Sequence, residues 1–256
     1  MKATLTVLGS GTSMGVPTIG CTCAVCHSPD PHDRRTRPSI LLEYAGKVVL
    51  IDTTPDFREQ AIREHITRID AVLYTHTHAD HILGIDDLRP LSFHRDGRIP
   101  LFARPEAADF IRNMFRYIFD ADYKFGGLAR LELKPIDGIF ELFGRTFEPI
   151  PVIHGETEIY GYRFGSAAYL TDFSEIPESS MPRLRDLDVL FLDGLRYKPH
   201  PTHSTVENSM RIADRLKAKR VFFTHICHDL PHAATNAALP PHVRLSYDGM
   251  KLEFEI

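Results

Sequence analysis

The sequence lacks long apolar runs, internal repeats and a strong excess of either charge. No apolar stretch approaches the roughly 20 residues that a membrane-spanning helix needs, so we expect no membrane partner. A formal net charge of −4 on 256 residues gives no general attraction for nucleic acid, which leaves only a local basic patch as a route to such a partner. Because no low-complexity tract or shift in composition marks a linker, we expect one globular domain over residues 1–256.

Cysteine is scarce, and three of the four cysteines lie close together as C-x-C-x-x-C. The opening residues MKATLTVLGSG indicate a strand and a glycine turn instead of a secretory signal, so we expect a reducing, cytoplasmic location. There, clustered cysteines are metal ligands or redox groups more often than disulfides. Cys21, Cys23 and Cys26 are one ligand short of a tetrahedral zinc site, and the alternative is three reduced thiols without a metal. The candidates for a fourth ligand are His228, Cys227 and His27.

The order of apolar segments and turn signals predicts an α/β (α+β) chain with two mixed β-sheets and helices outside them. The expected strands are residues 2–8, 39–45, 47–51, 70–75, 99–103, 188–192, 219–224, 243–247 and 250–255, with four or five more between 130 and 171. The expected helices are residues 53–65, 81–93, 105–118 and 205–217. Thr54 is the expected N-cap of the first helix, with Pro55 at its first position. Ser204 or Thr205 is the expected cap of the last, with Glu207 in a capping box.

Histidines and a carboxylate gather directly after the apolar strand AVLY, in the segment YTHTHADH. A strand that stops at a cluster of nitrogen and oxygen donors presents them at one edge of its sheet. Neutral imidazoles and carboxylates are ligands for zinc and similar divalent metals. The alternative is a polar loop with hydrogen-bonded histidines, but four donors within six residues favour a metal site. These donors are His76, His78, Asp80 and His81.

The segment THTHADH resembles the H-x-H-x-D-H signature of the metallo-β-lactamase-fold hydrolases. The other residues of that family's pattern follow in order: Asp52 in KVVLIDTTPD, His154 in FEPIPVIHG, Asp172 in AAYLTDFS and His225 in RVFFTHICHD. The resemblance covers essentially the whole chain. It implies the metallo-β-lactamase fold, which is an αββα sandwich of two mixed β-sheets flanked by helices, with a two-metal site at one edge of the sheets.

The resemblance also implies a role for each of these residues. One metal ion would be held by His76, His78 and His154, and the other by Asp80, His81 and His225. Asp172 would bridge both ions together with a water or hydroxide, and Asp52 would accept an imidazole N–H and so fix the tautomer of a ligand. Such donors suit zinc or manganese, with iron as a further option.

One branch of this family shares features at both ends of the chain. The sequence is similar to phosphodiesterases of phosphonate metabolism, which open phosphoribosyl cyclic phosphate and carry C-x-C-x-x-C near the N-terminus and T-H-x-x-H near the C-terminus. The opening LGSGTSMGVPTIGC and the segment THICH match both features. The resemblance therefore favours His228 as the residue that completes a structural zinc site with the cysteines of loop 20–28.

Three residues are expected to take part in the reaction itself. In the phosphodiesterase branch a histidine that is not a ligand lies within the stretch DGLRYKPHPTHSTVENS, so His203 is the candidate proton donor and His200 its alternative. Asp80 is the third candidate. The expected reaction is the opening of a small cyclic phosphodiester by a hydroxide that bridges two metal ions. Basic residues in HDRRTRPS are either phosphate contacts or solvated surface: Arg34, Arg35 and Arg37.

Other functions remain open from the sequence. A tRNA 3′-processing nuclease or a lactonase is the alternative within the fold, although no long Gly/Pro-rich insertion is present to bind RNA. A non-hydrolytic member of a cofactor-biosynthesis branch and a zinc-dependent nucleic-acid-binding module are the alternatives outside hydrolysis. A small phosphodiester is thus the expected partner and nucleic acid is disfavoured. A homodimer is a further option, with the aromatic segment 116–127 as a candidate lid or dimer contact.

Overall fold

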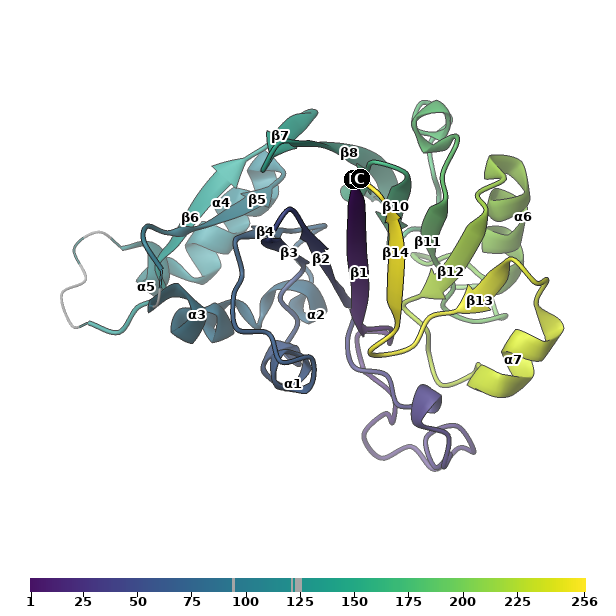
Figure 1. Cartoon of the computed structure of the whole chain (residues 1–256). Coiled ribbons are helices and arrows are strands. Elements are labelled where there is room, and N and C mark those ends of the chain that lie inside the picture. Colours follow the sequence, from purple (N-terminus) through teal and green to yellow (C-terminus); the bar gives the residue numbers. More distant parts are fainter. Residues whose placement is uncertain (94, 121, 123–125) are drawn as a thin grey trace.

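Two β-sheets lie face to face with helices on their outer faces (Figure 1), which confirms the predicted αββα sandwich. The computed structural model describes residues 1–93, 95–120, 122 and 126–256, so part of the aromatic segment 116–127 lies outside the described residues. In that part of the chain the strand order is β14-β1-β2-β3-β4-β5-β6 in one sheet and β13-β12-β11-β10-β9-β8-β7 in the other. Every helix described is too short or too polar to span a bilayer.

The first sheet brings three early strands to a common edge. β1 (Lys2–Gly9) pairs antiparallel with β2 (Ser39–Tyr44), which pairs antiparallel with β3 (Lys47–Ile51), so β1 and β3 end at the same edge. β4 (Ala71–Leu73) is parallel to β3 and ends there too. The sheet continues with the parallel strands β5 (Ile99–Ala103) and β6 (Leu131–Pro135).

The two ends of the chain lie side by side where β1 begins, on the side of the sheet opposite the edge at which β1, β3 and β4 end (Figure 1). β14 (Lys251–Glu255) pairs antiparallel with β1. The amino group of Met1 donates to Oε2 of Glu255 at 2.7 Å, and the N–H of Ile256 donates to the carbonyl of Met1 at 2.9 Å.

The second sheet repeats the arrangement with later strands. β8 (Arg145–His154) and β10 (Ala167–Leu170) are each antiparallel to β9 (Thr157–Phe164), so both end at the same edge. β11 (Val189–Asp193) and β12 (Arg220–Thr224) are parallel to β10 and end there as well. The short strands β7 (Phe140–Leu142) and β13 (Val243–Leu245) complete the sheet at its two sides.

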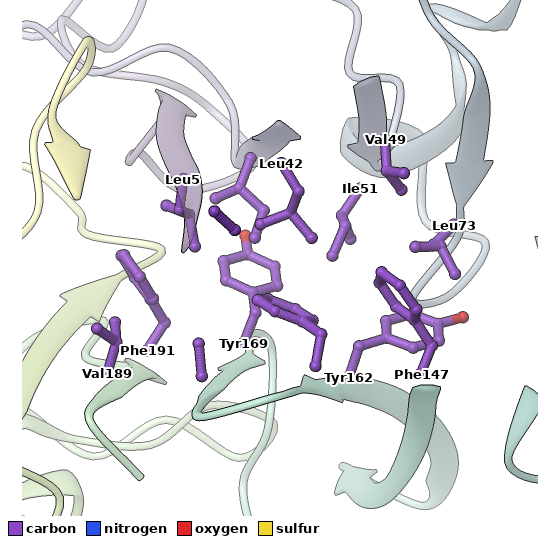
Figure 2. Packing of buried hydrophobic residues seen from close by; sticks show 14 of the residues in the cluster. Leu5, Leu42, Val49, Ile51, Leu73, Phe147, Tyr162, Tyr169, Val189 and Phe191 are labelled. Carbon is purple, nitrogen blue, oxygen red and sulfur yellow. The ribbon is translucent and has the colours of Figure 1, made fainter. Parts of the chain in front are cut away.

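The main core fills the space between the sheets. Strand side chains alternate between the two faces of a sheet, and those pointing inward meet in Figure 2, where Leu42 and Ile51 from the first sheet face Tyr162 and Phe191 from the second. These four side chains are almost fully buried. The phenol of Tyr162 donates to the carbonyl of Tyr74 across the interface at 2.7 Å. The layer is therefore tied by a hydrogen bond as well as by apolar packing.

The helices differ from the sequence predictions mainly at their ends. α1 (Phe57–Arg63) begins after Asp56, so the prediction that Thr54 caps it and that Pro55 is its first residue was wrong. The Thr54 hydroxyl instead accepts from the Asp56 N–H at 2.8 Å. The helix expected at 81–93 is divided into α2 (Ala79–Ile82), a 3-10 turn (Ile85–Leu88) and α3 (Arg89–Phe93). One reason is that the N–H of Gly84 donates to the carbonyl of Thr53 at 2.9 Å, which takes it out of the helical hydrogen-bond pattern.

The later helices show similar differences. The helix expected at 105–118 ends as α4 (Pro105–Met114), and α5 (Arg116–Phe119) follows after a break at Phe115. α6 (Val206–Leu216) is capped by Thr205, whose hydroxyl accepts from the Asn208 N–H at 3.1 Å. Glu207 is therefore not part of a capping box, because the third helical residue is Asn208. α7 (His232–Ala238) was not predicted.

Candidate active site

The predicted site residues lie at one edge of the sandwich, where strands of both sheets end. Asp52 follows β3 and His76 follows β4, while His154 ends β8, Asp172 follows β10 and His225 follows β12. Asp52, Asp172 and His225 have left-handed backbone, with φ of 66°, 55° and 57°. Residues other than glycine rarely adopt this conformation, and where they do they often belong to functional sites.

One group of donors consists of His76, His78 and His154, whose nearest ring nitrogens lie within 4.8 Å of one another. Nε2 of His154 is 3.3 Å from Nδ1 of His78. His76 and His154 are buried and His78 is exposed. Burial lowers the pKa of His154 to about 4 and that of His76 well below its usual value. Both imidazoles are therefore neutral, which is the form that binds a metal.

A second group of donors is fully buried beside the first and consists of Asp80, His81, Asp172 and His225. Oδ2 of Asp172 lies 3.4 Å from Nε2 of His81, 3.2 Å from Nε2 of His225 and 3.9 Å from Nε2 of His76, so this carboxylate lies between the two groups. Burial acts to lower the pKa of His225, but Asp172 and Asp80 outweigh it and raise that pKa to about 9. The pair of buried carboxylates therefore favours a positive charge at this position.

The hydrogen bonding of the donor atoms tests whether metal ions fit this site. Within the described residues, Nε2 of His76, His81 and His225 and Oδ2 of Asp80 are buried without a hydrogen-bond partner. Leaving a buried polar atom unpaired costs about 1–3 kcal/mol. These atoms converge on a shared space, where Oδ2 of Asp80 lies 3.3 Å from Nε2 of His81 and 3.6 Å from Nε2 of His225. They are of the nitrogen and oxygen types that bind zinc and manganese. The donor set therefore fits divalent cations.

Asp52 supports the second group of donors directly through His81 and the first through Thr75, a residue that the sequence analysis missed. Nδ1–H of His81 donates to Oδ2 of Asp52 at 2.7 Å, which leaves Nε2 free to face the cluster. The Thr75 hydroxyl donates to the same oxygen at 2.8 Å and accepts from Nδ1 of His76 at 3.0 Å. On the other side, Nδ1–H of His154 donates to the carbonyl of Thr202 at 2.8 Å. Such partners orient imidazole ligands and fix their tautomers.

His203 lies over this cluster and is held by Asp193, the last residue of β11. Nδ1–H of His203 donates to Oδ2 of Asp193 at 2.7 Å, and Asp193 is fully buried. The His203 ring stacks on the His225 ring with centroids 4.6 Å apart and planes 12° apart. The ring of His200 contacts that of His203, and its Nδ1 accepts from the Thr202 N–H at 3.3 Å. His200 therefore lies farther from the donor cluster than His203 does. Of the two histidines, His203 is thus the one oriented toward the cluster.

The sequence analysis did not single out Asp193, although a signal was present. Asp193 ends the apolar strand VLFLD in the same way that Asp52 follows KVVLI. A carboxylate at the end of a buried strand therefore indicates a candidate site residue in this chain.

The structure brings the three clustered cysteines together with His228. Nδ1 of His228 lies 3.2 Å from Sγ of Cys21, 3.5 Å from that of Cys23 and 3.4 Å from that of Cys26. The backbone N–H of Cys26 lowers the pKa of Cys23 to about 6, while burial raises the pKa of Cys26 to about 11. The set has the composition of a structural zinc site, in which the metal displaces the thiol protons.

The two other candidate ligands of that site lie elsewhere. Sγ of Cys227 accepts from the Asp229 N–H at 3.3 Å, and His27 is exposed to solvent. Neither belongs to the group of four donors formed by the described residues.

Arg35 ties the cysteine loop to the segment that follows β12. Its guanidinium is fully buried and donates to Asp33 at 3.0 Å, to the carbonyl of Cys227 at 2.8 Å and to that of Leu230 at 2.6 Å. It is therefore a structural tether, and both interpretations of Arg35, as a phosphate contact and as solvated surface, were wrong. Arg37 pairs with Asp56 at 2.8 Å instead. Arg34 is exposed, as the solvated-surface interpretation requires.

The family of the chain is indicated by three comparisons. Residues 47–226 match the β-lactamase superfamily domain. An octanoyltransferase from Porphyromonas gingivalis is 42% identical over 250 residues, which are 96% of this chain and 50% of that protein. A ribonuclease Z from Bradyrhizobium diazoefficiens is 29% identical over 147 residues, which are 54% of this chain and 47% of that protein. The chain thus spans about half the length of the curated relatives it matches.

Solved structures add a match over the full chain. The crystal structure of a new diphosphatase from the PhnP family has a TM-score of 0.94 and 63% identity, covering 99% of this chain and 98% of that chain. The structure of zinc-bound PqqB from Methylobacterium extorquens has a TM-score of 0.80 at 20% identity, covering 97% of this chain and 99% of that chain, and it shows a similar fold.

Proposed function

The chain belongs to the β-lactamase superfamily, and on this premise we propose that it is a metal-dependent hydrolase of a small phosphate ester, most specifically a cyclic phosphodiester. The observation that carries the proposal is His203, which Asp193 holds directly above a buried cluster of metal-binding donors. A cation site with an oriented proton donor beside it is an arrangement suited to hydrolysis of a phosphoester with a poor leaving group.

Two divalent cations would be held by the two groups of donors. His76, His78 and His154 would bind one ion and Asp80, His81 and His225 the other, with Asp172 between them. When bound, such ions lower the pKa of water and neutralise charge on the phosphate oxygens. Asp80 would thus act as a ligand, and Asp52 would keep His81 and, through Thr75, His76 in the tautomers that present Nε2. A zinc ion would occupy the separate site of three cysteines and His228.

His203 would protonate the leaving oxygen. Its Nδ1–H is committed to Asp193, so its Nε2 is the nitrogen that can carry a proton to the substrate. An alkoxide is a poor leaving group, and proton donation by a positioned histidine accelerates its departure by about 10²–10⁴-fold. Asp193 would stabilise the charged imidazolium and prevent the ring from turning.

Hydrolysis of a diphosphate is a second candidate, because the 63%-identical solved structure is described as a diphosphatase. A phosphate leaving group is a weaker base than an alkoxide and needs less help from an acid. The two candidates therefore differ in how strongly turnover depends on His203. A ribonuclease Z activity remains the alternative within the family, since curated relatives with that name match part of the chain.

The decisive experiment is a turnover screen after reconstitution with zinc, manganese or iron. The substrates are bis(p-nitrophenyl) phosphate, a ribose 1,2-cyclic phosphate, a dinucleoside diphosphate and a tRNA precursor. We expect turnover of both phosphodiesters and slower turnover of the tRNA precursor. Preference for the diphosphate would select the second candidate, and preference for the tRNA precursor would overturn both.

A further inference from the structure

A buried threonine comes directly before three of the predicted metal ligands. The pairs are Thr75–His76, Thr171–Asp172 and Thr224–His225. All three threonines are at most 2% exposed, and a buried hydroxyl generally has a hydrogen-bond partner. The Thr75 hydroxyl binds Asp52 and His76, whereas that of Thr224 has no partner among the described residues. The Thr171 hydroxyl binds the ligand that follows it, and the roles assigned so far leave this contact unexplained.

The contact between Thr171 and Asp172 depends on an unusual backbone conformation. The Thr171 hydroxyl donates to Oδ1 of Asp172 at 2.5 Å. In an extended strand, successive side chains point to opposite faces and do not meet. The left-handed backbone of Asp172, with a φ of 55°, departs from this geometry directly after β10 and brings the carboxylate to the preceding hydroxyl. Because hydrogen bonds to a carboxylate are about twice as strong as those between neutral groups, this contact holds Asp172 in one orientation.

The two oxygens of Asp172 consequently have separate partners. Oδ1 accepts from Thr171. Oδ2 faces the donor nitrogens, at 3.2 Å from Nε2 of His225, 3.4 Å from that of His81 and 3.9 Å from that of His76. The torsion that turns a carboxylate about its Cβ–Cγ bond is broad and roughly two-fold. Without the bond to Thr171, either oxygen or both could therefore turn toward one group of donors.

We propose that Thr171 is a positioning residue, which directs one oxygen of Asp172 toward both groups of donors and so allows two cations to bind as a pair. The inference rests on the proposed function, because it concerns how the same site is loaded. The cleft over the cluster is a hollow of about 660 Å³ whose walls include His76, His78 and His154. Thr171 is fully buried and does not line this cleft. It therefore acts through Asp172 and not by contact with a substrate there.

The test removes the hydroxyl while keeping the shape of the side chain. Thr171→Val should weaken manganese binding at the cluster by about 10–100-fold, the usual cost of losing a partner of a metal ligand. Competition with a chelator measures this affinity in protein whose Cys/His site is already loaded with zinc. Thr171→Ser keeps a hydroxyl and should bind manganese nearly as tightly as the parent. Thr171→Ala removes the same hydroxyl and replaces the valine variant if that variant does not fold.

Electron paramagnetic resonance of the manganese-loaded protein provides a readout that a general loss of stability would not change. Two manganese ions joined through one carboxylate oxygen interact magnetically, so the parent should give the signal of a coupled pair. At equal manganese content, Thr171→Val should give more of the signal of separate ions. Thr171→Ser should give the signal of the parent.

Thr224→Val is the matched control, because Thr224 is equally buried and directly precedes a ligand, but its hydroxyl has no partner in the described part of the chain. It should keep the affinity and the spectrum of the parent. Parent-like affinity and spectrum in Thr171→Val, an equal loss in Thr224→Val, or no recovery in Thr171→Ser would overturn the inference. A parent that binds a coupled manganese pair but hydrolyses no phosphate ester would overturn the proposed function alone. A parent that binds no ion beyond the zinc of the Cys/His site would overturn both.

Discussion

His203 shows how one side chain is prepared for its role by its neighbours. Its Nδ1 is bound to a buried carboxylate and its ring stacks on His225, so both its tautomer and its plane are fixed before substrate arrives. Little reorganisation is then needed during reaction, which is the condition under which acid catalysis is efficient.

Replacing His203 should separate proton donation from phosphate binding. His203→Ala should lower the rate on an alkyl phosphodiester by about 10²–10⁴-fold, the usual span for a positioned acid. The loss on a p-nitrophenyl diester should be much smaller, because p-nitrophenolate leaves without protonation. Initial rates on both substrates, with metal content as the control, provide the measurement. Equal losses would point to phosphate binding, and no loss would transfer the role to His200.

Asp193 should act only through His203. Asp193→Asn preserves shape but removes the carboxylate, and we expect a loss of roughly tenfold or more on the alkyl diester, since residues that act as a unit depend on one another. In a His203→Ala background the same substitution should cost almost nothing further. A double-mutant cycle measures this coupling, and additive losses would show that Asp193 has a separate role.

At the scale of elements, the loop after β1 and the segment after β12 form one structural unit. The N–H of Thr12 donates to the carbonyl of Ile226 at 3.2 Å and the N–H of Ile226 to that of Ser10 at 2.9 Å, while Arg35 binds the carbonyls of Cys227 and Leu230. His225, which would bind a catalytic metal, directly precedes this unit. The zinc site would therefore stabilise the backbone that positions His225.

Loss of one thiolate should accordingly affect stability more than chemistry. Cys23→Ser should lower the melting temperature and remove one zinc, since binding energy at a structural zinc site is also folding energy. Cys227→Ser is the matched control and should keep its zinc. Thermal melts and elemental analysis measure both effects. If Cys23→Ser melts like the parent but loses turnover, the cysteines belong to the reaction and this division of roles is wrong.

The sequence predicted the sandwich and its strands well, because buried strands carry long apolar segments bounded by turns. Helix ends were predicted less well, since some depend on tertiary contacts, such as the hydrogen bond from the Gly84 N–H to the carbonyl of Thr53. The predicted ligands were found together because each follows a strand end. Asp193 was not singled out, although it ends an apolar strand, because the hydrogen bond that gives it a role depends on how His203 folds back onto β11. The single domain and the ligand roles stay predictions.

At the scale of the whole molecule, fully loaded protein should contain three metal ions per chain. Two would occupy the His/Asp cluster and one zinc the Cys/His site, because both donor sets are assembled in the fold. Elemental analysis of protein reconstituted with excess metal provides the count. Two ions or fewer would count against one of the sites, and the Cys23→Ser variant would show which.

The neighbouring chain ends give the molecule an attachment point away from the cleft. Both ends lie at the sheet edge opposite the cleft, held by β1 and β14 (Figure 1). Either end could carry a label, a solid support or a fused protein. The attached group would lie on the side opposite the cleft and leave the cleft accessible. A short linker could also join the ends and allow the chain to be opened at an exposed turn, because neighbouring termini are what circular permutation requires.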